Sequence, residues 1–224
     1  MEEGKNVNSI GLITIGQSPR HDVTPEISVI LKGTPIIEAG ALDGLDRAAI
    51  AALAPGPADL TQVTRLADGS HVQVAKRHII PLMQKCVSEL ETKVDVILII
   101  CTGEFKQLTC RVPLMTTHKL LHCAVRGICN GRIGVIKPEA AQIQMAEEMW
   151  RASGLESVVV AGSPYKEPGQ LFAAAQELAG KDIELVVLDC IGFTQAMKQQ
   201  VKQIVQKPVV LPRTLAARLL AELT

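Results

Sequence analysis

The sequence predicts an α/β protein made of two pseudo-symmetric halves, each built on a mainly parallel sheet, with a cleft between them. Short runs rich in Ile and Val alternate with longer segments of helical pattern, which is typical of strand–helix units. Two runs in the second part of the chain also repeat runs in the first. Because 47% of the 224 residues are apolar, each half can bury a core of its own.

The first half opens with a strand at 10–15, a polar loop, and a helix whose start is marked by Thr24 and Pro25, residues suited to the N-cap and the first turn. Residues 42–75 interrupt the alternation. Within them, two short strands on either side of Asp68-Gly69 predict a β-hairpin. The other elements expected in this half are strands at 35–38 and 94–101 and helices at 77–90 and 114–126.

The second half returns to the alternation of strands and helices. Its expected strands lie at 132–136, 157–161, 183–189 and 208–211, and its expected helices at 138–152, 167–179, 195–205 and 214–223.

The internal repeat is carried by two pairs of segments. Ile10-Gly11-Leu12-Ile13 is echoed by Ile133-Gly134-Val135-Ile136. The run 96–103, which ends Cys101-Thr102-Gly103, is echoed by 185–192, which ends Cys190-Ile191-Gly192. In each half a cysteine therefore follows the third main strand, two residues before a glycine.

Composition excludes several classes of partner. Lys plus Arg equals Asp plus Glu at 23 each, and aromatic residues make up 2%, so neither a basic field nor stacking platforms for nucleic acid are present. The longest apolar run, 94–101, contains Asp95 and is too short to span a membrane. The polar N-terminus does not read as a signal peptide, and six scattered cysteines without a CxxC pair indicate reduced thiols. We expect a cytoplasmic protein.

Cys101 and Cys190 are the candidate catalytic residues. Ligands of open parallel sheets bind outside the carboxyl ends of the strands, and each cysteine is followed by a glycine that lets backbone approach a ligand. Both are also expected to precede helical segments, whose N-terminal dipole lowers a thiol pKa. The alternative is that both are small buried apolar residues. Cys86, Cys110, Cys123 and Cys129 are interpreted as packing residues.

The polar residues near the two cysteines and in the first loop each allow two interpretations. Asp189 and Glu104 lie near the cysteines, where each is either an acid–base group or a structural residue, namely a helix N-cap for Asp189 and a solvated loop residue for Glu104. In the first loop, Gln17, Ser18 and Arg20 suit a carboxylate, and the alternative is an ordinary capped turn.

Neither a metal nor a nucleotide cofactor is expected. His118 and His122 have the spacing of metal ligands but lack an obvious third ligand, so no metal site is predicted. Because neither a phosphate-binding loop nor a GxGxxG follows the first strand, nucleotide dependence is disfavoured.

The chain resembles the AroM family. The resemblance covers nearly its whole length and is carried by the segments 12–16, 96–102, 134–136 and 208–223 and, most specifically, by Leu188-Asp189-Cys190-Ile191-Gly192-Phe193. This family looks like a branch of the aspartate/glutamate racemase superfamily, whose members have two α/β halves and one cysteine from each. The resemblance implies a first half of 1–117 plus 212–224, with the hairpin inserted near 60–75, and a second half of 118–211.

The resemblance also implies a reaction. We expect a cofactor-independent racemase, epimerase or related isomerase of a small carboxylate or amino acid, with Cys101 and Cys190 as the acid–base pair. Backbone amides after each cysteine would hold the carboxylate. The alternatives are a one-cysteine decarboxylase or cis–trans isomerase, and a non-catalytic binding protein for a small acid. A homodimer is the default assembly. The expected substrate-binding residues are Gln17, Ser18, Arg20, Thr102, Gly103, Glu104, Ile191, Gly192 and Phe193.

Overall fold

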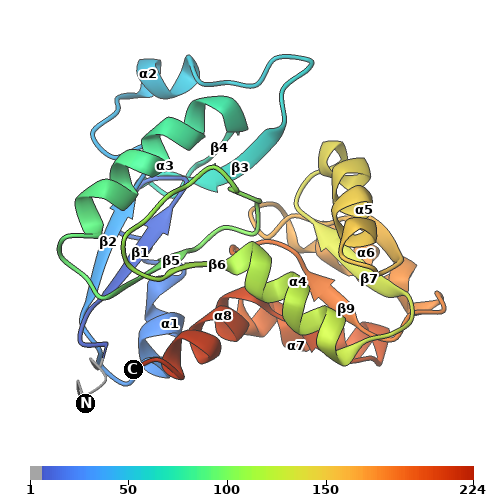
Figure 1. The fold of residues 1–224 in the computed structure, drawn as a ribbon. Helices are drawn as coiled ribbons and strands as arrows, with labels where there is room; N and C mark the ends of the chain where they lie inside the picture. The colour runs from blue at the N-terminus through green and yellow to red at the C-terminus, as the bar shows by residue number, and fades with distance from the viewer. Residues whose placement is uncertain (1–6) are drawn as a thin grey trace. The chain divides into compact units, whose positions relative to one another are not determined.

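The β-strands of residues 7–224, the part of the chain that the computed structural model describes, form two four-stranded parallel sheets and a separate antiparallel hairpin (Figure 1). The chain divides into two compact units, 1–117 plus 216–224 and 118–215. It leaves the first unit at the start of helix α4 (Thr117–Ile128) and returns to it within helix α8 (Pro212–Ala221).

The first unit contains a sheet of strand order β2-β1-β5-β6. Its strands run in one direction, with β1 paired to both β2 and β5 and β5 paired to β6. The bounds of its elements are β1 Ile10–Thr14, α1 Thr24–Ile30, β2 Ile36–Gly40, α2 Arg47–Ala51, β3 Thr61–Arg65, β4 His71–Ala75, α3 Lys76–Leu90, β5 Val96–Ile99 and β6 Leu114–Thr116.

The second unit contains a sheet of order β10-β9-β7-β8. Its strands are also parallel. The bounds of its elements are β7 Ile133–Lys137, the 3₁₀ turn η1 Ala140–Gln142, α5 Ile143–Ala152, β8 Ser157–Ala161, α6 Pro168–Ala179, β9 Val186–Leu188, α7 Gln195–Val205 and β10 Val209–Val210.

The two sheets have the same topology. When the four strands of each sheet are counted in chain order, the first lies between the second and the third, and the fourth lies next to the third at the edge. Strands β1, β2, β5 and β6 therefore correspond to β7, β8, β9 and β10. This agreement confirms the predicted α/β class with two parallel-sheet halves.

Alternating side chains of the strands pack into cores on the faces of each sheet, as the two-residue period of a strand requires. In the first unit, Ile13, Ile97 and Ile99 pack with α3 through its buried residues, which include Ile79, Met83 and Val87. In the second unit, Val186 and Leu188 pack with α6 and α7, whereas Val187 faces Trp150 of α5. The residues that pack against helices on each face of the sheet are therefore fixed. Because side chains alternate along a strand, this also fixes the face toward which the residues after the strand point.

The hairpin forms as predicted, whereas two short elements differ from the sequence-based expectations. Strands β3 and β4 pair antiparallel from Thr61↔Ala75 to Arg65↔His71, and α3 follows directly (Figure 1). Residues 114–116, expected to begin a helix, instead form β6 because they pair with Ile97–Ile99 at the sheet edge. The unexpected short helix α2 is capped by Asp46, whose carboxylate accepts the Ala49 N–H at 2.8 Å.

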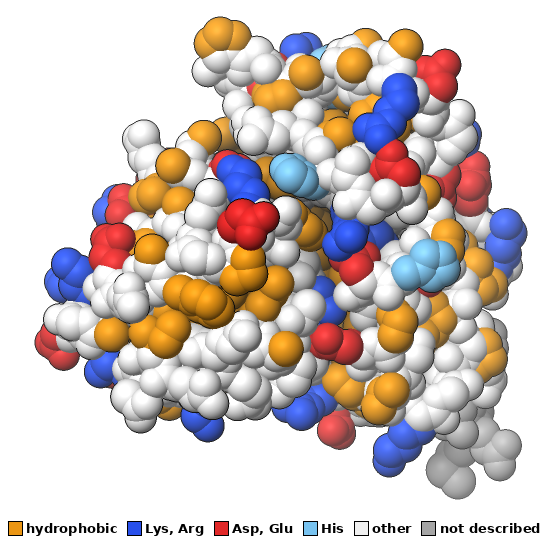
Figure 2. Space-filling view, turned by 180° about the vertical axis from the view of Figure 1, so that it is seen from behind, with side chains coloured by type: hydrophobic (Ala, Val, Ile, Leu, Met, Phe, Trp, Pro, Cys, Tyr) orange, Lys and Arg blue, Asp and Glu red, His pale blue; other side chains and the backbone are white. Residues whose placement is uncertain are grey.

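The surface mixes charges of both signs. Figure 2 shows basic and acidic side chains interspersed on the face that it displays, in keeping with 23 of each in the chain. Within residues 7–224, no helix has the length and apolar character that a membrane crossing requires.

Candidate functional site

Cys101 and Cys190 occupy equivalent positions in their respective units. Each lies two residues after the last residue of the third strand, β5 ending at Ile99 and β9 at Leu188. Each belongs to the core cluster of the helix that precedes its strand, α3 or α6. Both side chains are buried, with 8% of each residue exposed. The carboxyl end of a parallel strand is where such sheets bind ligands.

The Cys101 sulfur has two described partners in the first unit. The backbone N–H of Gly103 points at Sγ, with N and Sγ 3.3 Å apart. The thiol in turn donates to Oε1 of Gln62, 3.8 Å away on strand β3. A β-carbon added to Gly103 would overlap that same Oε1, so only glycine allows the amide of Gln62 to lie beside the thiol.

The Cys190 sulfur has a matching environment in the second unit. The backbone N–H of Gly192 lies 3.4 Å from Sγ, and the hydroxyl of Tyr165 lies 3.9 Å from it. A β-carbon on Gly192 would overlap the Tyr165 hydroxyl and ring. Each half therefore presents a thiol, a glycine N–H directed at its sulfur, and one polar side chain packed against the glycine. An N–H that donates to sulfur stabilises the thiolate.

Both cysteines precede helices, as expected, but the helix after Cys101 is α4, which begins only at Thr117. Residues 102–113 form turns and extended segments without a helix, because the chain crosses to the edge strand β6 before α4 begins. Cys190 is closer to a helix: α7 begins at Gln195, and its N-cap is Thr194, whose hydroxyl accepts the Met197 N–H. In both units the hydrogen bond to sulfur comes instead from the glycine two residues on.

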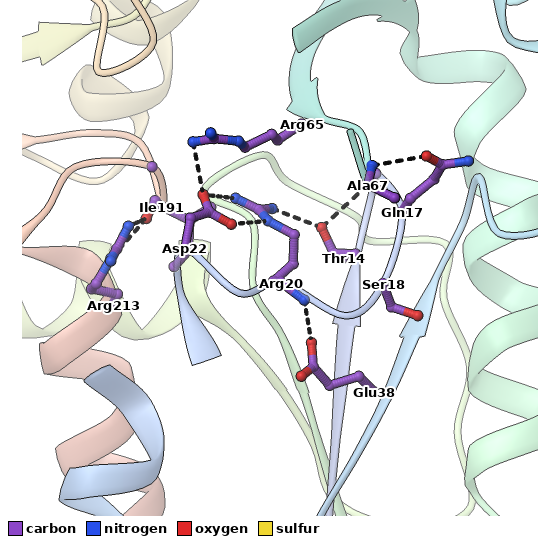
Figure 3. Close-up of polar contacts among 12 residues, drawn as sticks. Thr14, Gln17, Ser18, Arg20, Asp22, Glu38, Arg65, Ala67, Ile191 and Arg213 are labelled. Atoms are coloured by element: carbon purple, nitrogen blue, oxygen red, sulfur yellow. Dashed lines mark hydrogen bonds and ion pairs between the residues drawn. The ribbon is translucent and has the colours of Figure 1, made fainter. Parts of the chain in front are cut away.

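The segment after Cys190 is anchored by a buried arginine. Nε and Nη2 of Arg213, a residue with 0% exposure, donate to the carbonyl of Ile191 at 3.0 and 2.7 Å (Figure 3). Phe193 is fully buried in the core of the same unit. Ile191 and Phe193 thus hold the turn in place, while Gly192 contacts the thiol.

Asp189 belongs to a buried ion pair. Its Oδ1 lies 3.2 Å from Nζ of Lys137 at the end of β7, and its Oδ2 accepts from Nε1 of Trp150 at 3.3 Å. All three residues are buried. Because Thr194 caps α7, the N-cap interpretation of Asp189 is wrong. Neighbouring residues of an extended chain point to opposite faces. Asp189 contacts Trp150, whereas Cys190 joins the core of α6 and α7, so the carboxylate and the thiol lie on opposite faces of the sheet.

Glu104 and Thr102 lie in the turn that follows Cys101. Glu104 pairs with Lys106 at 3.0 Å and is partly exposed, whereas Thr102 is buried.

The loop after β1 forms a closed polar network. The Arg20 guanidinium donates to both carboxylate oxygens of Asp22, at 2.8 and 2.9 Å, and to Oγ1 of Thr14 at 2.9 Å (Figure 3). Arg65 approaches Asp22 from the end of β3, with Nη1 and Oδ2 3.8 Å apart. Burial raises the pKa of Asp22, but the hydrogen bonds and charge of Arg20 outweigh it and hold that pKa below its usual value.

Gln17 and Ser18 of the same loop also contact protein groups. Gln17 accepts the Ala67 N–H at 2.9 Å, which ties the loop to the hairpin. The Ser18 hydroxyl donates to Asp43 at 2.5 Å. The three loop residues thus bind separate partners within the first unit: Ala67 for Gln17, Asp43 for Ser18, and Asp22 with Thr14 for Arg20.

Cys86 and Cys129 are buried, in keeping with a packing role, whereas Cys123 is exposed on α4, so its interpretation as a packing residue is wrong. Burial raises the pKa of Cys86 to about 11. His122 stacks on Trp150 with ring centroids 3.8 Å apart, and its Nδ1 contacts the Ser153 hydroxyl. Among the described residues, no group of three His, Cys, Asp or Glu side chains is arranged to hold a metal ion.

Sequence reasoning missed Gln62, Tyr165, Lys137 and Arg213. Tyr165 had a usable signal, since it is the single tyrosine of the chain and follows the carboxyl end of β8. Lys137 did as well, because a lysine directly after a buried run of Ile and Val must find a partner. Gln62 and Arg213 gave no such signal.

The fold places the chain in a class of α/β proteins built from two parallel-sheet units. Solved structures with this fold include the maleate isomerase Iso from Pseudomonas putida S16 (TM-score 0.62, 15% identity, 93% of this chain and 89% of that chain). They also include unliganded arylmalonate decarboxylase (0.62, 14%, 96% and 91%). A third is glutamate racemase from Aquifex pyrophilus (0.61, 19%, 96% and 84%).

The family model described as AroM protein matches residues 10–224. The chain belongs to the AroM family, and its fold is that of the aspartate/glutamate racemase superfamily, as the resemblance in the sequence predicts. No curated protein matches the sequence.

Proposed function

We propose that this protein is a cofactor-independent racemase, epimerase or related isomerase of a small carboxylate, with Cys101 and Cys190 as its acid–base pair. The observation that carries the proposal is the repeated thiol environment. In each unit a buried cysteine at the carboxyl end of the third strand receives a glycine N–H on its sulfur, at 3.3 Å for Cys101 and 3.4 Å for Cys190. The maleate isomerase and glutamate racemase of the same fold are consistent with this class of reaction.

In the proposed reaction, one cysteine acts as a thiolate and removes the proton from the carbon next to the carboxylate. The electron pair of the broken C–H bond moves into the carboxylate, which becomes an enolate. The second cysteine, as a thiol, then returns a proton to the other face of that carbon. The backbone amides that follow each cysteine stabilise the charge of the enolate. The second cysteine is then a thiolate and can remove the α-proton of the opposite enantiomer, which is the reverse reaction.

A one-cysteine reaction is the second candidate. It is favoured by the difference between the two side-chain partners, since Cys101 contacts the amide of Gln62 whereas Cys190 contacts the phenol of Tyr165. A phenol is an acid–base group and an amide is not. In this version Cys190 alone acts, either as the donor of the proton that replaces CO₂ in a decarboxylation or as the nucleophile that adds to the double bond of a cis–trans isomerase substrate and leaves again after rotation.

Solvent exchange separates these candidates. The purified protein would be incubated in D₂O with a panel of small chiral carboxylic and amino acids, substituted malonates and cis-unsaturated diacids. Loss of the α-proton, decarboxylation and cis–trans isomerisation would be followed by ¹H NMR. The two-base scheme predicts exchange and stereochemical inversion, and Cys101→Ala and Cys190→Ala should each abolish the inversion. Cys123→Ala, at an exposed position of α4, is the matched control and retains full exchange. Full activity in either of the first two variants would refute the two-base scheme.

If only one of the two variants is silent, the one-cysteine reaction takes its place. If acids bind, as a rise in thermal stability would indicate, but none exchanges its proton or is otherwise turned over, the protein is a binding protein.

A further inference from the structure

A lysine accompanies Cys101 in the first unit. Lys76 is the first residue of α3, and its backbone N–H donates to the carbonyl of Leu60 at 2.9 Å. Its ammonium lies 5.6 Å from the ring centroid of Phe105, a buried residue in the segment that follows Cys101. Burial lowers the pKa of Lys76, and the negative charges of Glu104 and Cys101 act in the opposite direction.

The inserted hairpin connects this lysine to a residue that contacts the thiol. Strand β3 supplies Gln62, which accepts from the thiol of Cys101 and pairs across the hairpin with Val74 of β4. Strand β4 ends at Ala75, so Lys76 follows at once. The strands described in the second unit, β7 to β10, all belong to its parallel sheet, so the hairpin distinguishes the surroundings of Cys101 from those of Cys190.

We propose that Lys76 is a positioning residue whose ammonium pairs with the thiolate of Cys101 and raises the fraction of Cys101 that is ionised at neutral pH. The inference rests on the proposed function for its purpose, because it makes Cys101 the cysteine that accepts the proton. The ion pair itself requires no substrate.

The charged groups around Cys101 favour this pairing. Glu104 opposes it, since a second negative charge disfavours the thiolate. Lys106 offsets that charge, because its ammonium lies 3.0 Å from the Glu104 carboxylate. From strand β3 the neutral amide of Gln62 contacts the thiol, and the next residue of α3, Arg77, is bound to Asp59 at 2.6 Å. The geometry that supports the pairing is the ammonium of Lys76 over the ring of Phe105, since Phe105 and Cys101 belong to the same core cluster.

Alkylation at a series of pH values tests the pair without a substrate. The full-length protein would be treated with iodoacetamide, and the rate of modification at the Cys101 peptide would be measured by mass spectrometry. Because the thiolate is the reactive form, the midpoint of the pH profile reports ionisation and its plateau reports access. The variants are Lys76→Met, which removes the charge, and Lys76→Arg, which keeps it. Lys85→Met, an exposed lysine on the same helix, is the matched control.

We expect Lys76→Met to lower the Cys101 rate at pH 7 by about tenfold, the effect of one unit in a thiol titration, with the plateau unchanged. Lys76→Arg and Lys85→Met should keep the wild-type profile, and Cys190 in the same samples should not change. An unchanged midpoint in Lys76→Met overturns the inference, as does an equal loss at Cys101 and Cys190.

The solvent-exchange assay keeps this result separate from the proposed function. If the midpoint of Cys101 alkylation is unchanged in Lys76→Met and the protein still exchanges the α-proton of an acid, the role of Lys76 is refuted and the proposed isomerase function stands. A shifted midpoint in a protein that exchanges no acid confirms the ion pair and refutes the isomerase.

Discussion

Replacing Lys137 by Met should destabilise the second unit strongly. The Lys137 and Asp189 side chains are 7% and 4% exposed, and their charged atoms lie 3.2 Å apart. The methionine has a similar length and leaves little empty space, so the main effect is a buried carboxylate without its cation. Removal of one partner from a buried pair costs about 3–5 kcal/mol. Neutralising both partners, in Lys137→Met with Asp189→Asn, should restore most of that loss.

The chain contains its own probe for this experiment. Trp150 is the single tryptophan and donates to the Asp189 carboxylate, so its fluorescence reports unfolding around the pair. Urea denaturation at pH 7 gives the free energy of unfolding of each variant. Lys181→Met, at an exposed position of the same unit, is the control and should change it by less than about 0.5 kcal/mol. A loss below about 1 kcal/mol in Lys137→Met, or a double variant no more stable than the single one, would refute the reasoning.

Two further predictions concern the Arg20 network and Gly192. Asp22→Asn should lower the free energy of unfolding at pH 7 by about 1.5–3 kcal/mol, because Arg20 loses a charged partner. The folded-state pKa of Asp22 is depressed, so the stability that this carboxylate contributes is present above the unfolded pKa of about 3.9. That stability is lost as pH falls through the lower folded-state pKa. The free energy of unfolding of the variant should therefore depend less on pH below about 5. Urea melts from pH 2 to 7 measure this, and equal slopes in both proteins would contradict it. Gly192→Ala should cost about 1–3 kcal/mol by overlap with Tyr165, whereas Gly127→Ala, with open space around it in α4, should be neutral or stabilising. Equal stabilities of the two alanine variants would count against this packing.

Much of the fold could be predicted from the sequence, because buried parallel strands are short apolar runs and the helices between them are longer. The strand predicted at 157–161 and the helix at 195–205 have the observed bounds. Strand β6 could not be predicted, since its three residues become a strand only by pairing with Ile97–Ile99. Local pattern carries no information about such a partner.

The candidate site was predictable only in part. The positions of Cys101 and Cys190 at equivalent strand ends follow from the repeated Cys-x-Gly. Their polar partners do not, because the contact of Gln62 with Cys101 depends on how the hairpin packs beside β5, and that of Tyr165 on the path of the chain after β8. These contacts join residues 39 and 25 positions apart in the chain.

The division of the chain has a consequence for its biosynthesis. The second unit is one uninterrupted segment, 118–215, whereas the first consists of 1–117 and 216–224. When only the first 117 residues have emerged from the ribosome, the last segment of the first unit, 216–224, has not yet been synthesised. The second unit can complete its fold once residue 215 has emerged, and the first unit closes when 216–224 follow. Nascent chains stalled just after residue 215 should consequently expose the earlier segment to proteases and chaperones for longer than the later one.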